Sequence, residues 1–260
     1  MTFLHSPLGR AYYQSASPYQ DSGPPPPELT YLENIVDHFG GDLEALWDLT
    51  SITSVPDLSG NGWTMTVTGS GTIALGTGPT INGDAHSAVS ASGSTRRLAT
   101  VGGFTGASAA NGRTIIVWCN LSGSSAGFEF LLGRATTSDG EIQMYSNTAG
   151  NLYAEAQGEN GTTEIASPAG STDMDDTGWN CCFAWWDPAD DDVYIQLNTG
   201  APTSEAGTID INTDCASPYT VFASNTGGSP VRSGGLIALP MVINRVLTSG
   251  ERASVATGVF

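Results

Sequence analysis

From Trp63 onward the chain alternates short apolar runs with turn-forming dipeptides, and this pattern constrains the fold more than any other feature. Residues 63–68 alternate large apolar side chains with threonines, as in a strand with one buried face. Residues 113–119 are apolar on both faces, as in a central strand. Because no helical pattern separates the runs, we predict an all-β antiparallel sandwich or jelly roll. The strongest turn signals are Asn82-Gly83, Asn111-Gly112, Asp139-Gly140 and Asn160-Gly161.

An arm rich in proline precedes the strands. Residues 1–28 contain Pro7, Pro18 and a run of four prolines at 24–27, so we predict an extended conformation rather than a helix. The arm carries more apolar and aromatic side chains than a solvated linker needs, which favours a segment that anchors on a partner. The predicted contact residues are Phe3, Leu4, Leu8, Tyr12, Tyr13 and Tyr19.

A short helical linker is expected next, over residues 29–46. Thr30 and Glu33 form a capping box that opens a helix, and Gly40 supplies its left-handed stop. Asp42 is predicted to cap a second, shorter helical turn over residues 43–47.

The rest of the chain, residues 47–260, is predicted to be the jelly-roll domain. Its last element should be another short flanking helix. Thr248 and Glu251 form the capping box that opens it, and Gly258 ends it.

The charge balance excludes some partners. The chain has no lysine, and eight arginines against 26 acidic residues give a formal charge of −18. Such a surface repels phosphate backbones and anionic lipids, so we predict neither nucleic-acid nor membrane binding. The first residues lack the pattern of a secretory signal, so folding in a cytoplasm is expected. The four cysteines have no metal-binding spacing, and we expect them to be reduced and largely buried.

Four sequence blocks occur in an order typical of one family. Together they resemble the concanavalin A-like, laminin-G-like jelly-roll family, in the form common in bacteriophage virion proteins. The resemblance covers about residues 43–258, although Thr199 stands where the family has glycine and Ala238 where an acidic residue is usual. The blocks are residues 46–63, 113–118, 179–200 and 235–251.

Enzymatic activity is not expected. Related β-glucanases carry Glu-x-Asp-x-Glu on one strand, which places carboxylates on one face for catalysis. The most similar segment here, residues 208–212, reads Thr-Ile-Asp-Ile-Asn and lacks both glutamates. His5, His38 and His86 are scattered among the arm, the first predicted helix and a loop, which gives no support for a hydrolytic triad.

The sequence is compatible with two kinds of binding site, one for calcium and one for a sugar. The family resemblance implies calcium at loop ends, although Asp-rich turns are more often simply solvated. Alternation along residues 179–186 places Trp186 on the face opposite Trp179 and Trp185, and makes Trp186 the candidate for an exposed sugar-stacking ring. The calcium candidates are Asp173, Asp175, Asp176, Asp190, Asp191 and Asp192.

These inferences predict a non-enzymatic structural protein of a bacteriophage virion, capsid-decorating or head-attached. Its arm would dock on the major capsid protein or another virion protein, and its jelly roll would project outward. The protein would be made in the host cytoplasm and displayed on the virion surface, as a homo-oligomer for which a trimer is one option. The alternative is a glycan-binding adhesin or a tail-associated receptor-binding protein.

Overall fold

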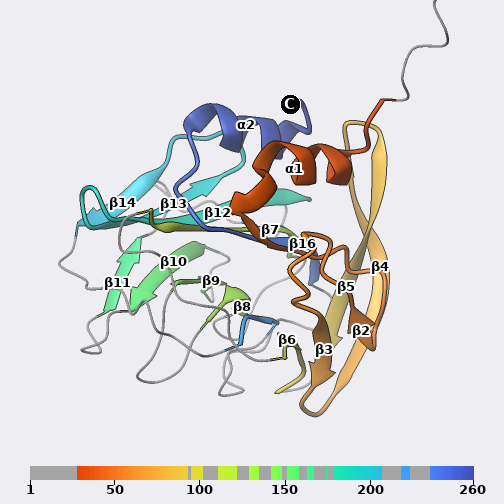
Figure 1. Cartoon of the computed structure of the whole chain (residues 1–260). Helices are drawn as coiled ribbons and strands as arrows, with labels where there is room; N and C mark the ends of the chain where they lie inside the picture. Colours follow the sequence, from red (N-terminus) through yellow and green to blue (C-terminus); the bar gives the residue numbers. More distant parts are fainter. Residues whose placement is uncertain are drawn as a thin grey trace, which may run out of the picture.

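The computed structural model shows a sandwich of two antiparallel sheets with two helices on one side (Figure 1). The predicted all-β jelly-roll sandwich is therefore confirmed. The two α-helices of the described part have nine residues each, too few to cross a membrane. The structure describes residues 28–92, 95–101, 111–121, 129–134, 142–147, 151–157, 163–166, 174, 178–206, 218–222 and 235–260.

Sheet A has the strand order β14-β13-β12-β7-β16-β5-β4, and β1 also pairs with β16. Strands β7 and β12 lie side by side in the middle of this sheet, and the sequence of each is apolar on both faces. The bounds are β1 (Leu43–Leu46), β4 (Thr72–Ile81), β5 (Asp84–Ser92), β7 (Arg113–Asn120), β12 (Asn180–Asp187), β13 (Asp192–Leu197), β14 (Thr203–Ala206) and β16 (Leu236–Ile243).

Sheet B has the order β11-β10-β9-β8-β15-β6-β3-β2. It faces the inner side of sheet A, and one apolar core lies between the two. The bounds are β2 (Ser54–Val55), β3 (Met65–Thr68), β6 (Arg97–Thr100), β8 (Glu129–Gly133), β9 (Ile142–Ser146), β10 (Leu152–Gln157), β11 (Thr163–Ala166) and β15 (Thr220–Val221).

Strand β7 is buried along nearly its whole length because it has a packed layer on each side. Ile115 and Val117 belong to the core between the sheets, whereas Ile116 and Trp118 belong to a second core beneath the helices. The predicted central strand is thereby confirmed. Sheet A is the middle layer of the described molecule, with the two helices on one side of it and sheet B on the other (Figure 1).

The helices begin and end where the sequence predicts. Both capping boxes are formed, at the start of α1 (Tyr31–Phe39) and of α2 (Ser249–Thr257). Gly258 ends α2 in the left-handed conformation, as predicted, whereas Gly40 ends α1 with a positive φ but outside the left-handed helical region. An L-residue adopts a positive φ only at a cost. Tyr31 joins the two helices, since its hydroxyl donates a hydrogen bond of 3.0 Å to the carbonyl of Val255.

The helical turn predicted over residues 43–47 is wrong. After the 3₁₀ turn η1 (Gly40–Asp42) the chain enters strand β1, which pairs with β16 through Leu43 opposite Ile243 and Leu46 opposite Met241. A bulge in β16 near Leu239, whose φ is positive, lets β16 pair with β5 before it and β1 after it. Tertiary pairing therefore outweighs the local helix propensity of these residues.

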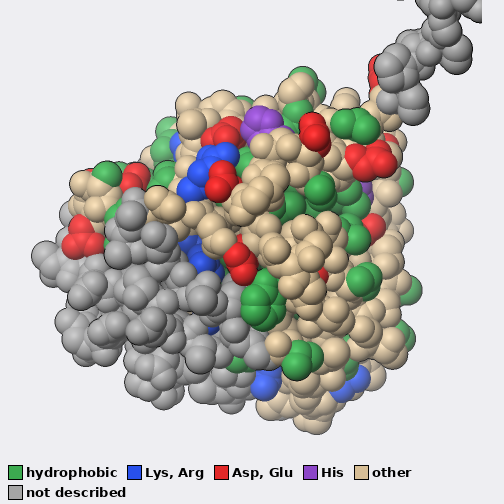
Figure 2. Space-filling model, viewed as in Figure 1, with side chains coloured by type: hydrophobic (Ala, Val, Ile, Leu, Met, Phe, Trp, Pro, Cys, Tyr) green, Lys and Arg blue, Asp and Glu red, His purple; other side chains and the backbone are tan. Residues whose placement is uncertain are grey.

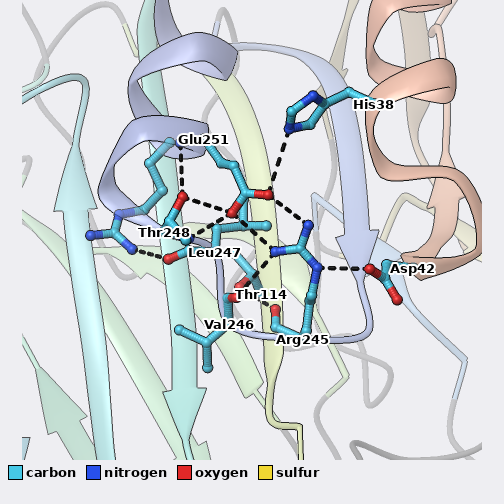
Figure 3. A network of polar contacts seen from close by, with 9 residues as sticks. His38, Asp42, Thr114, Arg245, Val246, Leu247, Thr248 and Glu251 are labelled. Carbon is cyan, nitrogen blue, oxygen red and sulfur yellow. Dashed lines mark hydrogen bonds and ion pairs between the residues drawn. The ribbon is translucent and has the colours of Figure 1, made fainter. Parts of the chain in front are cut away.

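One ion-pair network fastens the start of α2 to the end of η1 (Figure 3). The Arg245 guanidinium donates to both carboxylate oxygens of Glu251, at 2.7 and 3.0 Å, and to Asp42 at 2.8 Å. We call these three residues the Arg245 network. The bonds from Arg245, and those from the Thr248 cap, lower the pKa of Glu251 to about 2. Sequence alone indicates the cap but not the arginine.

Replacement of Glu251 by Gln should lower the free energy of unfolding at pH 7 by about 1–3 kcal/mol, because a charge-assisted pair is lost. The folded-state pKa is depressed, so wild-type Glu251 stabilises the fold fully above its ordinary value of 4.5 and loses this effect as the pH falls towards 2. The difference between the proteins should therefore shrink over that range in chemical denaturation. Glu205→Gln, on an exposed edge strand, is the control and should leave stability nearly unchanged. A difference that stays constant down to pH 2 would contradict the network's role.

Candidate functional site

The outer side of sheet B carries an unusual set of polar and aromatic side chains. Along β9 and β10, alternate residues such as Ile142, Met144 and Ala154 belong to the core between the sheets. Because successive side chains of a strand point to opposite sides, the residues between them lie on the outer side of the sheet. Both described helices cover sheet A instead (Figure 1). We call this set the tyrosine face: Gln143, Tyr145, Tyr153 and Glu155.

Strand register brings the two tyrosines together. Tyr153 pairs directly with Tyr145, and the rings stack with their centroids 5.6 Å apart and their planes 10° from parallel. Tyr145 is buried, whereas Tyr153 is partly exposed. Asn147 donates a hydrogen bond of 3.2 Å to the Tyr153 hydroxyl, which holds the outer ring in place. Asn147 is itself fixed by the turn, because its side chain accepts a bond of 3.0 Å from the Asn151 amide.

A carboxylate lies beside the rings. Glu155 is opposite Gln143 in the ladder, and its side chain accepts hydrogen bonds from Gln143 and Tyr145. Burial raises the pKa of Glu155 above its ordinary value in spite of these two bonds. Burial, and then the nearby Glu155 charge, also raise the pKa of Tyr145. A charged group held where ionisation is costly is typical of functional sites.

A hollow with a volume of about 460 Å³ lies beside the Arg245 network. Its polar groups already bind one another. The Arg245 guanidinium bonds Glu251 and Asp42, and an oxygen of Asp187 accepts from the Ala189 amide at 3.0 Å. The network also favours the charged form of Glu251, whereas burial disfavours the charged form of Glu155, so we rank this hollow below the tyrosine face. The lining residues are Asp42, Asn111, Asp187, Pro188, Ala189, Arg245 and Val246.

The expected exposure of Trp186 is wrong. Only 5% of the residue is accessible, and its ring lies in the core between the two sheets. Alternation along β12 is as predicted, with Phe183 and Trp185 on the helix side and Trp186 on the other. The other side is sheet B rather than solvent, because β12 is an inner strand of a covered sheet. Trp186 cannot stack on a sugar from this position.

The calcium prediction is not supported where the structure can test it. Asp190 accepts a bond of 2.5 Å from the Tyr194 hydroxyl, Asp191 occupies the turn with a positive φ, and Asp192 pairs in the ladder. Among the described residues no group of three or more acidic, histidine or cysteine side chains is arranged to hold a metal ion. The other candidates, Asp173, Asp175 and Asp176, lie outside the described residues.

Of the remaining residues singled out in the sequence, some lie within the described part of the structure and others lie outside it. All six arm residues, Phe3 to Tyr19, and the segment 208–212 lie outside the described residues. Cys119, Cys181 and Cys182 are free and buried, as predicted, whereas Cys215 lies outside the described part. His38 lies 3.5 Å from Glu251, and His86 packs edge-on against Tyr31 at 5.4 Å.

Short apolar runs at residues 141–145 and 152–157 predict two strands, which the structure shows as β9 and β10, but they do not identify the tyrosine face. Its signal is visible afterwards, as the alternation of Gln143 and Tyr145 with Met144, and of Tyr153 and Glu155 with Ala154. That alternation does not say which strand pairs with which. Only the register places Tyr145 against Tyr153.

The chain matches no protein-family model and no curated protein. Solved structures share its fold. The receptor binding domain of botulinum neurotoxin D superposes with a TM-score of 0.62 at 12% identity, over 84% of this chain and 52% of that one. The binding domain of Paraclostridial Mosquitocidal Protein 1 gives 0.61 at 14% identity, over 83% and 52%.

A third structure, the botulinum neurotoxin serotype D ligand binding domain in complex with N-acetylneuraminic acid, gives 0.62 at 11% identity, over 86% and 52%. The chain thus spans about half the length of each of these domains. At such identities the likeness shows the jelly-roll sandwich and no shared residues of a site. The fold of this chain is therefore a β-sandwich that is also found in the receptor binding domain of botulinum neurotoxin D and in the binding domain of Paraclostridial Mosquitocidal Protein 1.

Proposed function

We propose that this chain is a non-enzymatic binding module that recognises a neutral glycan on the tyrosine face. The observation that carries the proposal is the stacked pair of Tyr145 and Tyr153 beside the hydrogen-bonding groups of Gln143 and Glu155. A sugar ring presents an apolar face and a rim of hydroxyls. The partly exposed ring of Tyr153 offers apolar surface for the first, and the carboxylate and amide offer partners for the second.

The charge of the chain selects among glycans. With a formal charge of −18, the surface repels an acidic sugar, and Glu155 adds a local carboxylate. A neutral oligosaccharide meets no such repulsion, and its hydroxyls donate well to a carboxylate. The proposal therefore differs from the sugar in the neurotoxin D structure, N-acetylneuraminic acid, although that neighbour supports a binding role for the sandwich.

The predicted place on a phage particle stays a prediction. It depends on the arm, residues 1–28, of which all but the last residue lie outside the described part. Co-sedimentation of the full chain with phage particles, compared with a chain that starts at Glu28, is the test. A glycan-binding tail or surface protein would satisfy both proposals.

A glycan array with neutral and sialylated oligosaccharides, followed by calorimetric titration of the best neutral ligand, tests the proposed function. Tyr153→Ala should weaken binding about tenfold or more, equal to about 1.4 kcal/mol. Tyr194→Ala is the matched control, because Tyr194 is also a stacked tyrosine, 4.9 Å from Trp185, but lies on sheet A. Equal affinities for the two variants, or an array on which only sialylated glycans bind, would refute the proposal.

Glu155→Gln should change the pH dependence of stability. Because the folded-state pKa of Glu155 is raised, the contribution of this residue to stability is fully present below its ordinary value of 4.5 and is lost as the pH rises through the folded value. The Glu155→Gln variant lacks this loss, so in urea denaturation its free energy of unfolding should increase relative to that of the wild type as the pH rises above 4.5. Glu205→Gln is the control and should follow the wild type. If the wild type loses no more stability than the Glu155→Gln variant as the pH rises, ionisation of Glu155 does not destabilise the folded state. An ionisation cost, retained in the fold, is what a functional carboxylate is expected to show.

A further inference from the structure

Helix α1 has a second apolar side that the rest of the molecule covers only in part. Its first side, with Tyr31, Ile35 and Phe39, is buried against sheet A. On the other side a groove of about 400 Å³ is open to solvent. We call it the α1 groove, and it is lined by Leu29, Leu32, Glu33, Val36, Asp37 and Leu58.

The α1 groove leaves large apolar side chains in water. Leu29 is 51% exposed and Leu58 is 39% exposed, while Leu32 and Val36 are partly exposed between them. Figure 2 shows hydrophobic and acidic side chains next to one another over this helix. Covering such a groove gains about 25 cal/mol for each Å² of apolar surface that leaves water. Exposed apolar grooves of this kind mark places where another segment binds.

We propose that the aromatic part of this chain's own arm, residues 3–19, docks in the α1 groove. The described chain starts at Glu28, directly before Leu29, which lines the groove. The residues ahead of Glu28 carry apolar and aromatic side chains of the kind that can cover the groove. They are Phe3, Leu4, Leu8, Tyr12, Tyr13 and Tyr19.

Charge supports the same occupant. The first 27 residues hold one of the eight arginines and one of the 26 acidic residues, so their formal charge is zero while the rest of the chain carries all of the −18. The arm is thus a long segment that the acidic body does not repel. Glu33 and Asp37 at the edge of the groove can also accept bonds from Arg10, the arm's only arginine.

The distances allow the arm to return to its own body. The four prolines at 24–27 span about 12 Å in an extended proline helix, and Asp21-Ser22-Gly23 ahead of them are turn-forming residues. Leu32 and Val36, both in α1, are four residues apart, about 6 Å along the helix axis. A chain reversed at Gly23 therefore brings Tyr19 and the residues before it along the groove.

The same chain is favoured over a second copy. A tethered arm acts at an effective concentration of about millimolar, independent of the protein concentration. A second copy must also approach against the repulsion between two bodies that each carry −18.

Native-state cleavage of the full chain by chymotrypsin tests the proposal. Cleavage after Tyr12, Tyr13 and Tyr19 is followed by mass spectrometry. A double variant of the groove, Leu29→Ser with Leu58→Ser, should be cut at least about tenfold faster than the wild type, since a docked arm is accessible only when it opens. Leu75→Ser is the control, because Leu75 is 55% exposed on β4 and outside the groove. It should be cut at the wild-type rate.

Three outcomes would overturn the proposal. Equal rates for the wild type and the groove variant would mean that the arm is not held there. A control cut as fast as the groove variant, with Leu58→Ser alone cut at the same rate as the control, would show that faster cleavage comes from general loosening of the fold and not from loss of the groove. Protection that rises with protein concentration, together with a dimer in sedimentation velocity, would assign the groove to the arm of a second copy. None of these results depends on glycan binding.

Discussion

The rest of the structure depends on the burial of both sides of sheet A. Strands β7 and β12 send Ile115, Val117 and Trp186 into the core between the sheets, and Ile116 and Trp185 into the core beneath the helices. Packed layers on both sides leave these strands no polar face. Both helices must therefore pack against sheet A. The described helices do not cover the outer side of sheet B (Figure 1).

Two polar features serve different ends in this arrangement. The Arg245 network holds α2 in place, and its charges stabilise one another, as the low pKa of Glu251 records. Glu155 on the tyrosine face is in the opposite situation, because its neighbours do not offset the cost of burying its charge. The contribution of Glu251 to stability is sufficient reason for its presence. The ligand proposed for the tyrosine face would give a reason to retain such a carboxylate.

Particular residues show how far sequence reasoning reached. The capping boxes at Thr30 and Thr248 and the central strand β7 were predictable, because their signals lie within a few neighbouring residues. The strand at residues 43–46 was not, since its pairing with β16 depends on a bulge near the other end of the chain. Trp186 was placed on the correct side of its strand, but nothing local says that sheet B covers that side.

By itself, the sequence determined the all-β class, the caps of both helices, the strongly acidic surface and the separation of a proline-rich arm from the strands. These follow from period, composition and hydrogen bonds between near neighbours. Only the tertiary structure decided which strands pair, which faces remain open and which tyrosines meet. The physical reason is that sheet register joins residues far apart in the chain, such as Leu43 and Ile243, and one step of register moves every side chain of a strand to the opposite face.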